Sequence, residues 1–116
     1  MKNVKDSLVN QIHTQLNCKE EQTKDIIELL LSDIQLFDKK QGDYGPSNIS
    51  KFGVMGVLVR SSDKIERLIN LYKKNTLEEG ENPATRNTDE SVIDSWSDLS
   101  VYGAIARVVA QGKWNK

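Results

Sequence analysis

Three carboxylates recur at four-residue intervals in the stretch DESVIDSWSDLSVYGAIARVVA, which runs from Asp89 to Ala110. On a helix, the side chains of Glu90, Asp94 and Asp98 lie on one face, which continues into the apolar residues of the second half. The acids therefore lie over the stripe that must face the core, or at its edge. Because burying uncompensated charge is costly, the pattern predicts a positive partner. Magnesium is a natural candidate, since it prefers carboxylate oxygens and leaves room for water and substrate phosphate.

A plainer interpretation of the same acids is that they complement the positive end of the helix dipole on a solvated face. This interpretation suits Glu90, in the first turn, as well as the metal interpretation does. It suits Asp94 and Asp98 less well, because both lie inside the helix and on its apolar side.

A second group of charged residues lies in RSSDKIERL, where Arg60, Asp63, Lys64 and Arg67 fall within an arc of roughly 100° on a helix. The three cations flank an apolar face and are suited to holding phosphate oxygens. Asp63 is suited to adding a carboxylate to the metal or to orienting Arg67. The alternative is a set of exposed helix ion pairs, each of which contributes little.

The stretch KKQGDYGPSN holds further candidates for ligand binding. Its two glycines and one proline predict a tight turn. Lys40 would add a cation, Tyr44 would stack on a base, and Asp43 would hydrogen-bond to that base. The alternative is a plain connection between helices with a packed tyrosine. Neither a phosphate-binding P-loop nor a dinucleotide-binding glycine motif is present in the sequence.

The elements that must position these residues are helices. Apolar residues recur at three- and four-residue steps, and turn-rich stretches surround the two prolines. Gly53 and Gly56 are expected to interrupt the third helix, and Gly112 to end the last one. Helices are expected at residues 4–16, 20–40, 49–74 and 88–111. The fold class predicted is all-α, a bundle of about four helices with the last two antiparallel across the site.

Length and composition set the remaining limits. With 116 residues, the chain is expected to form a single domain, 1–116. A net charge of −1 argues against direct nucleic-acid binding. Cys18 is the single cysteine and fits a reducing compartment, whereas His13 is expected at the surface. No apolar run resembles a membrane span or a signal-peptide core, so we expect a cytoplasmic protein with no membrane contact.

Taken in order, the motifs GDYGPSN, VRSSDKIERLINL and DESVIDSWSDLSVYGAI resemble the nucleotide modification-associated domain 1 family, which is found largely in phages and bacteria. The resemblance covers about residues 39–110, and the first helix, 1–18, lies outside it. The family is similar to the MazG-like all-α NTP pyrophosphatases. The resemblance implies a MazG-like bundle, the host cytoplasm if the chain is phage-encoded, and a homo-oligomer. Trp96 and Leu99, which lie off the acidic stripe, are the residues expected at the contact between copies.

MazG-like enzymes use an ExxE motif and an ExxD motif to bind magnesium and to cleave a nucleoside triphosphate to monophosphate and pyrophosphate. The matching positions here are Asp63-x-x-Glu66 and Glu90-x-x-x-Asp94-x-x-x-Asp98, so the second spacing is wider by one residue. The resemblance implies a magnesium-dependent pyrophosphohydrolase. Its metal-binding and catalytic residues would be Asp63, Glu90, Asp94 and Asp98. Its substrate-binding residues would be Lys40, Asp43, Tyr44, Arg60, Lys64 and Arg67.

The alternative is a protein that binds a nucleotide without turning it over. Such a protein would sequester a nucleotide signal during phage counter-defence, or would support DNA base modification. The altered spacing of the second motif favours this alternative, whereas the three acids favour a metal and therefore the enzyme. Magnesium-dependent hydrolysis is therefore the function that we predict first, and binding without turnover is the alternative.

Overall fold

The computed structural model describes residues 4–44, 47–74 and 90–114, without the side chains of residues 4, 5, 44, 47, 48 and 74. Within these residues every regular element is a helix and no strand occurs. This confirms the prediction of an all-α fold. The helices are α1 (Val4–Gln15), α2 (Gln22–Tyr44), α3 (Ser47–Ser50), α4 (Gly53–Lys74) and α5 (Glu90–Ala110).

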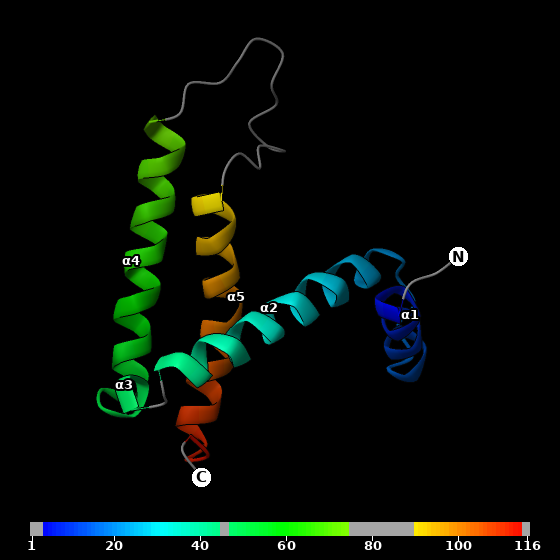
Figure 1. The fold of residues 1–116 in the computed structure, drawn as a ribbon, viewed down its shortest axis with the longest axis horizontal. Helices are drawn as coiled ribbons and strands as arrows, with labels where there is room; N and C mark the ends of the chain where they lie inside the picture. The colour runs from blue at the N-terminus through cyan, green and yellow to red at the C-terminus, as the bar shows by residue number, and fades with distance from the viewer. Residues whose placement is uncertain (1–3, 45–46, 75–89, 115–116) are drawn as a thin grey trace.

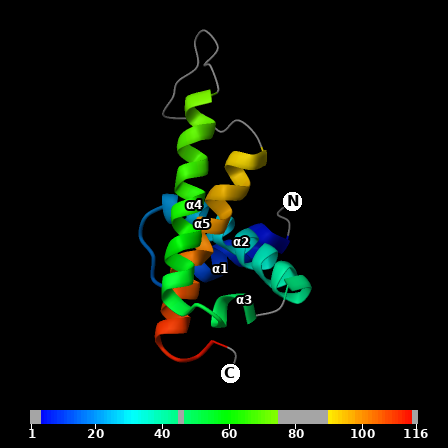
Figure 2. The ribbon, with the colours of Figure 1, turned by 90° about the vertical axis from the view of Figure 1, so that its left-hand side faces the viewer.

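The last two long helices, α4 and α5, lie side by side and run in opposite directions, as predicted (Figures 1 and 2). Helix α2 crosses α5 through its second half, and α1 packs against the first half of α2, away from α4 (Figure 1). The radius of gyration is 16.8 Å, compared with about 13 Å for a compact chain of this length. The helices therefore form an open, flattened arrangement, with extents of 48 × 40 × 25 Å along its three axes. No helix among the described residues is long and apolar enough to cross a membrane.

The predicted loop at residues 41–48 is wrong for residues 41–44, because α2 continues through Tyr44, and for residues 47–48, which belong to α3. Residues 45 and 46 lie outside the described residues. Gly42 is tolerated within the helix, and a Cβ built there would meet no atom within 4 Å. The helix ends two residues before Pro46, whose ring disfavours the helical conformation at the residue that precedes it. The extra turn of helix begins at Gln41, directly after Lys40, and both residues lie on the side of α2 that faces α5.

The expected interruption of the third helix is a break at residues 51–52, between α3 and α4. Helix α4 begins at Gly53, whose φ of +62° is a conformation that residues with a side chain rarely adopt. Gly56 does not interrupt the helix. Gly56 instead allows the side chain of Phe52 to lie close to the backbone of α4, because a Cβ at residue 56 would lie only 2.6 Å from the Cβ of Phe52.

Left-handed residues end two of the helices. At the end of α5, Gly112 has a φ of +72°, and the amide of Lys113 donates to the carbonyl of Val108 at 3.1 Å. At the end of α1, Asn17 takes the same role, with a φ of 57°. Both ends are Schellman caps, which satisfy the last carbonyls of a helix.

The prediction that His13 lies at the surface is wrong, because its side chain is buried. Its Nε2 donates a hydrogen bond to the carbonyl of Glu20, at 2.8 Å. The turn after α1 folds back over the ring, so the imidazole joins this turn to the end of α1. Its role here is structural.

The main apolar core lies where α2, α3, α4 and α5 meet. Ile49, Val57 and Ile105 form its buried centre. Phe37 and Trp114 pack beside them, with ring centroids 6.2 Å apart. This core supports one wall of the pocket described next.

Candidate functional site

Helices α2, α4 and α5 enclose a pocket of about 260 Å³. Its charged lining consists of three cations and three acids: Lys40, Arg60, Lys64, Asp33, Asp94 and Asp98. Its apolar lining is continuous with the core: Leu36, Phe37, Ile49, Val101 and Ile105. Gln41, Ser97 and Tyr102 complete the wall. The pocket therefore has a charged side and an apolar side.

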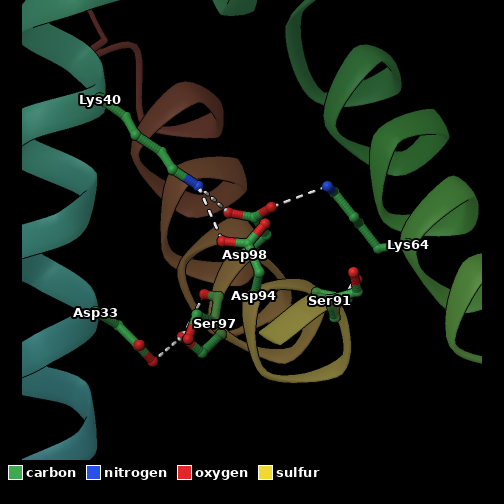
Figure 3. Close-up of polar contacts among 9 residues, drawn as sticks. Asp33, Lys40, Lys64, Ser91, Asp94, Ser97 and Asp98 are labelled. Carbon is green, nitrogen blue, oxygen red and sulfur yellow. Dashed lines mark hydrogen bonds and ion pairs between the residues drawn. The ribbon is translucent and has the colours of Figure 1, made fainter. Parts of the chain in front are cut away.

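Asp98 lies at the centre of the charged side, between two lysines from different helices (Figure 3). Lys64 of α4 donates to its Oδ2 at 2.9 Å, and Lys40 of α2 donates to its Oδ1 at 3.0 Å. Lys40 also lies 3.5 Å from Oδ1 of Asp94. The positive partners that the acids on this stripe require are thus present within the chain itself.

The pair of Asp98 and Lys64 is shielded from water more than an ordinary surface ion pair is. The side chain of Asp98 is only 14% exposed and that of Lys64 is 22% exposed. Burial alone would raise the pKa of Asp98, but the hydrogen bonds and charges of Lys64 and Lys40 lower it below its usual value. Burial alone would lower the pKa of Lys40, but the hydrogen bond and charge of Asp98, together with Asp94, raise it. Both groups are therefore charged at neutral pH.

Tyr102 stands one helical turn after Asp98 and faces the same pocket. Burial raises the pKa of its phenol, and the negative charge of Asp98 raises it further, against the opposing effect of Lys64, Arg60 and Lys40. The phenol stays protonated at neutral pH and is able to donate a hydrogen bond to a ligand.

Five of the residues predicted for the site line this pocket: Lys40, Arg60, Lys64, Asp94 and Asp98. Four others are exposed and do not line it: Asp43, Asp63, Arg67 and Glu90. The side chain of Tyr44 lies outside the described residues. The pocket thus brings together most of the predicted cations and two of the four predicted metal ligands.

The predicted magnesium set does not come together in this conformation. Across residues 4–44, 47–74 and 90–114, no three side chains among histidine, cysteine, aspartate and glutamate form a group that could hold a metal ion. Asp63 is exposed and does not line the pocket, although Lys64, the next residue and about 100° further around α4, does. Glu90 is the first residue of α5 and is exposed. The remaining pair, Asp94 and Asp98, shares the ammonium of Lys40.

Sequence reasoning missed Asp33, Gln41 and Ser97. Asp33 precedes Lys40 by seven residues, which places both on one face of α2, so this spacing was a usable signal. The carboxylate of Asp33 accepts a hydrogen bond from Ser100 of α5, and this bond lies at the rim of the pocket. No sequence pattern separates Ser97 from the other serines of α5.

No protein-family model matches the chain, and comparisons with curated proteins and with solved structures found no match. The resemblance to the nucleotide modification-associated domain 1 family and to MazG-like enzymes stays a prediction from the motifs.

Proposed function

We propose that the pocket between α2, α4 and α5 binds a small phosphorylated molecule of the nucleotide class. The observation that carries this proposal is the position of Asp98, whose two oxygens each accept from a lysine of a different helix. Two ammonium groups that converge on paired oxygens also suit the oxygens of a phosphate. Arg60 lines the same pocket and adds a guanidinium, a group well matched to phosphate.

The apolar side of the pocket suits the rest of such a ligand. Phe37 and Tyr102 offer aromatic surface, and Leu36, Ile49 and Val101 offer aliphatic surface. Small-molecule sites commonly pair a mainly apolar wall with a few polar groups that fix orientation. A base or sugar would lie against this side while the phosphate meets the lysines.

The charge of the lining favours a ligand with few negative charges. Three cations, Lys40, Arg60 and Lys64, face three acids, Asp33, Asp94 and Asp98, so the lining has no net charge. A single phosphate monoester carries about 1.5 to 2 negative charges at neutral pH, and a triphosphate carries more. We therefore expect a nucleoside monophosphate or a phosphodiester such as a cyclic nucleotide to bind more tightly than a triphosphate.

In this scheme the incoming phosphate competes with Asp98 for Lys40 and Lys64. Binding exchanges two internal ion pairs for two charge-assisted hydrogen bonds to the ligand. The affinity is accordingly modest and depends on salt, because both sets of contacts are electrostatic. For a phage-encoded protein in the host cytoplasm, this activity would serve to sequester a nucleotide signal or to supply a nucleotide for base modification.

A second candidate function is the hydrolysis of a nucleoside triphosphate by water to monophosphate and pyrophosphate. The feature that favours it is the presence of two carboxylates, Asp94 and Asp98, in the same pocket as three cations. Magnesium can be held by one or two carboxylates together with substrate phosphate, but here both carboxylates already pair with the ammonium of Lys40. Their arrangement here therefore fits a magnesium site poorly.

The decisive experiment measures binding and turnover together. The protein is incubated with nucleoside monophosphates, cyclic nucleotides and triphosphates, in the presence of magnesium or EDTA, and the free and bound nucleotides are analysed by chromatography. Intact ligand recovered from heat-denatured protein, with or without EDTA, supports binding. Monophosphate and pyrophosphate formed only with magnesium support the hydrolase. If no nucleotide is bound and none is consumed, both functions are wrong.

A matched pair of lysine variants tests the pocket itself. Lys40→Met removes a cation that lines the pocket, whereas Lys39→Met removes the exposed neighbour that does not. The loss of one charge-assisted hydrogen bond, about 1.5–3 kcal/mol, is expected to weaken nucleotide binding by roughly 10- to 100-fold in Lys40→Met alone. Equal affinities for the two variants, measured by calorimetry, would place the ligand elsewhere.

A further inference from the structure

An apolar surface lies beside the pocket, on the part of α2, α4 and α5 toward the start of α5, and Trp96 stands at its centre. One groove of about 340 Å³, between α2 and α5, is lined mainly by apolar residues: Ile26, Leu29, Leu30, Ile93 and Trp96. A second groove of about 400 Å³, between α4 and α5, is lined by Ile65, Leu68, Ile69, Tyr72, Lys73 and Trp96. Trp96 lines both grooves, so they form one surface, which we call the Trp96 face.

The side chains of the Trp96 face are unusually exposed for their types. Trp96 is 53% exposed and Leu29 is 64% exposed, and Ile26, Ile65 and Ile93 are also exposed. Contiguous apolar patches of this kind are rare on monomeric proteins and mark interaction surfaces. The indole Nε1 of Trp96 donates to the hydroxyl of Tyr72 at 3.4 Å, which leaves the ring itself available for packing.

The accessible area of the chain is also larger than that of a compact monomer of its mass. Its accessible area is 8922 Å², whereas a compact monomer of 13.1 kDa would expose about 6,400 Å². A standard interface buries about 800 Å² on each partner, roughly a third of that difference. Such a contact would cover part of the area that the open arrangement of the helices leaves exposed.

We infer that the Trp96 face binds the same face of a second copy of this chain. The charged residues at its two sides make it self-complementary. Asp33 lies in the groove on the α2 side, and Lys73 lies in the groove on the α4 side, with Trp96 between them. A two-fold axis near Trp96 would lay the α2 groove of one copy over the α4 groove of the other. Asp33 of each copy would then face Lys73 of the other copy, twice.

This arrangement also places the second copy at the edge of the ligand pocket. Asp33 and Ser97 line both the pocket and the α2–α5 groove. The second copy would therefore cover one rim of the pocket without entering it. The inference about the dimer does not depend on which ligand the pocket binds.

Leu99, which the sequence suggested as a contact residue together with Trp96, is half-buried and lines neither groove. The proposed contact therefore uses Trp96 with residues of α2 and α4 that lie far from it in the sequence.

The experiment measures mass in solution by sedimentation equilibrium at micromolar concentration. The wild-type chain is expected to have about twice the 13.1 kDa mass of one copy. Ile93→Glu and Ile69→Glu, which introduce a charge into each groove, are expected to reduce the mass to that of one copy. Met55→Glu is the matched control, because Met55 is a 67% exposed residue of α4 about 21 Å along the helix from Ile69. It is expected to leave the dimer intact.

Circular dichroism verifies that each variant keeps its helices. If the groove variants lose them, a charge reversal at the rim provides an independent test. Asp33→Lys and Lys73→Asp are each expected to weaken the dimer, because each places like charges opposite one another. The double variant is expected to restore it. A wild-type monomer overturns the inference, including one that binds lipid vesicles instead, and so does a dimer that neither the groove variants nor the charge reversals weaken.

Discussion

Replacing Asp98 with asparagine tests the central ion-pair group of the structure. The substitution keeps the shape of the side chain but removes the charge that joins Lys40 to Lys64. An exposed ion pair contributes about 0.2–1 kcal/mol, and disrupting a fully buried pair costs about 3–5 kcal/mol. Because Asp98 is partly buried and serves two lysines, we expect a loss of about 2 kcal/mol in the free energy of unfolding. This corresponds to a Tm lower by about 8 °C for a chain of this size.

The same substitution should strengthen the binding of an anion. Once Asp98 is neutral, Lys40 and Lys64 have lost their internal competitor for a phosphate. If about 1.4 kcal/mol of the lost interaction is recovered in binding, the affinity for a nucleoside monophosphate rises about tenfold. Lower stability combined with tighter binding is not expected of a residue that merely supports the fold.

Thermal melting followed by circular dichroism and calorimetric titration with adenosine monophosphate measure the two effects. Asp94→Asn is the matched control, because Asp94 is 45% exposed and lies 3.5 Å from Lys40. It should cost less than about 0.5 kcal/mol. The reasoning is refuted if Asp98→Asn melts with the wild type, if it binds the nucleotide more weakly, or if both variants lose the same stability.

Three further outcomes follow from the contacts described. Because the pKa of Asp98 is lowered in the folded protein, its charge stabilises the fold fully above about pH 3.9, the ordinary pKa of aspartate. This stabilisation is lost as the pH falls through the lower pKa of the folded state. The acid unfolding curve of Asp98→Asn should therefore lack the loss of stability that Asp98 causes in the wild type. Because the pKa of Lys40 is raised in the folded protein, its charge stabilises the fold fully below about pH 10.4, and this stabilisation is lost as the pH rises through the higher pKa of the folded state. In Lys40→Met, the free energy of unfolding, measured with urea, should therefore fall less steeply at alkaline pH than in the wild type. Gly112→Ala should lower the free energy of unfolding by about 1 kcal/mol, because Gly112 has a φ of +72°. Gly103→Ala should raise it by about 0.5–1 kcal/mol, because Gly103 lies within α5 and a new Cβ there would meet nothing within 4 Å. Thermal melts that shift both variants in the same direction would contradict this.

The helices themselves could be predicted because their signals are local. Three- and four-residue apolar spacing, Gly112 at the end of α5 and the glycines near the start of α4 all act within a few residues. The end of α2 was predicted wrongly because the local signal there favours a turn. A Gly-Asp-Tyr-Gly-Pro stretch favours a turn locally, but helical hydrogen bonds continue through Tyr44.

The sequence also determined that Asp94 and Asp98 lie on the stripe of α5 that continues into the core, and that a cation must meet them. Helical periodicity fixes which residues share a face, and the cost of burying charge requires the partner. Neither argument depends on any other helix.

Only the tertiary structure decided which cation that is. Lys40 lies 58 residues from Asp98 in the sequence, and their contact depends on how α2 crosses α5. The rotation of α4 about its own axis places Lys64 in the pocket and Asp63 outside it, although the two are neighbours. Crossing angles and rotations result from the packing of side chains between helices, which periodicity within one helix does not contain. For the same reason, the sequence indicated Trp96 as a contact residue but not the two grooves that meet there.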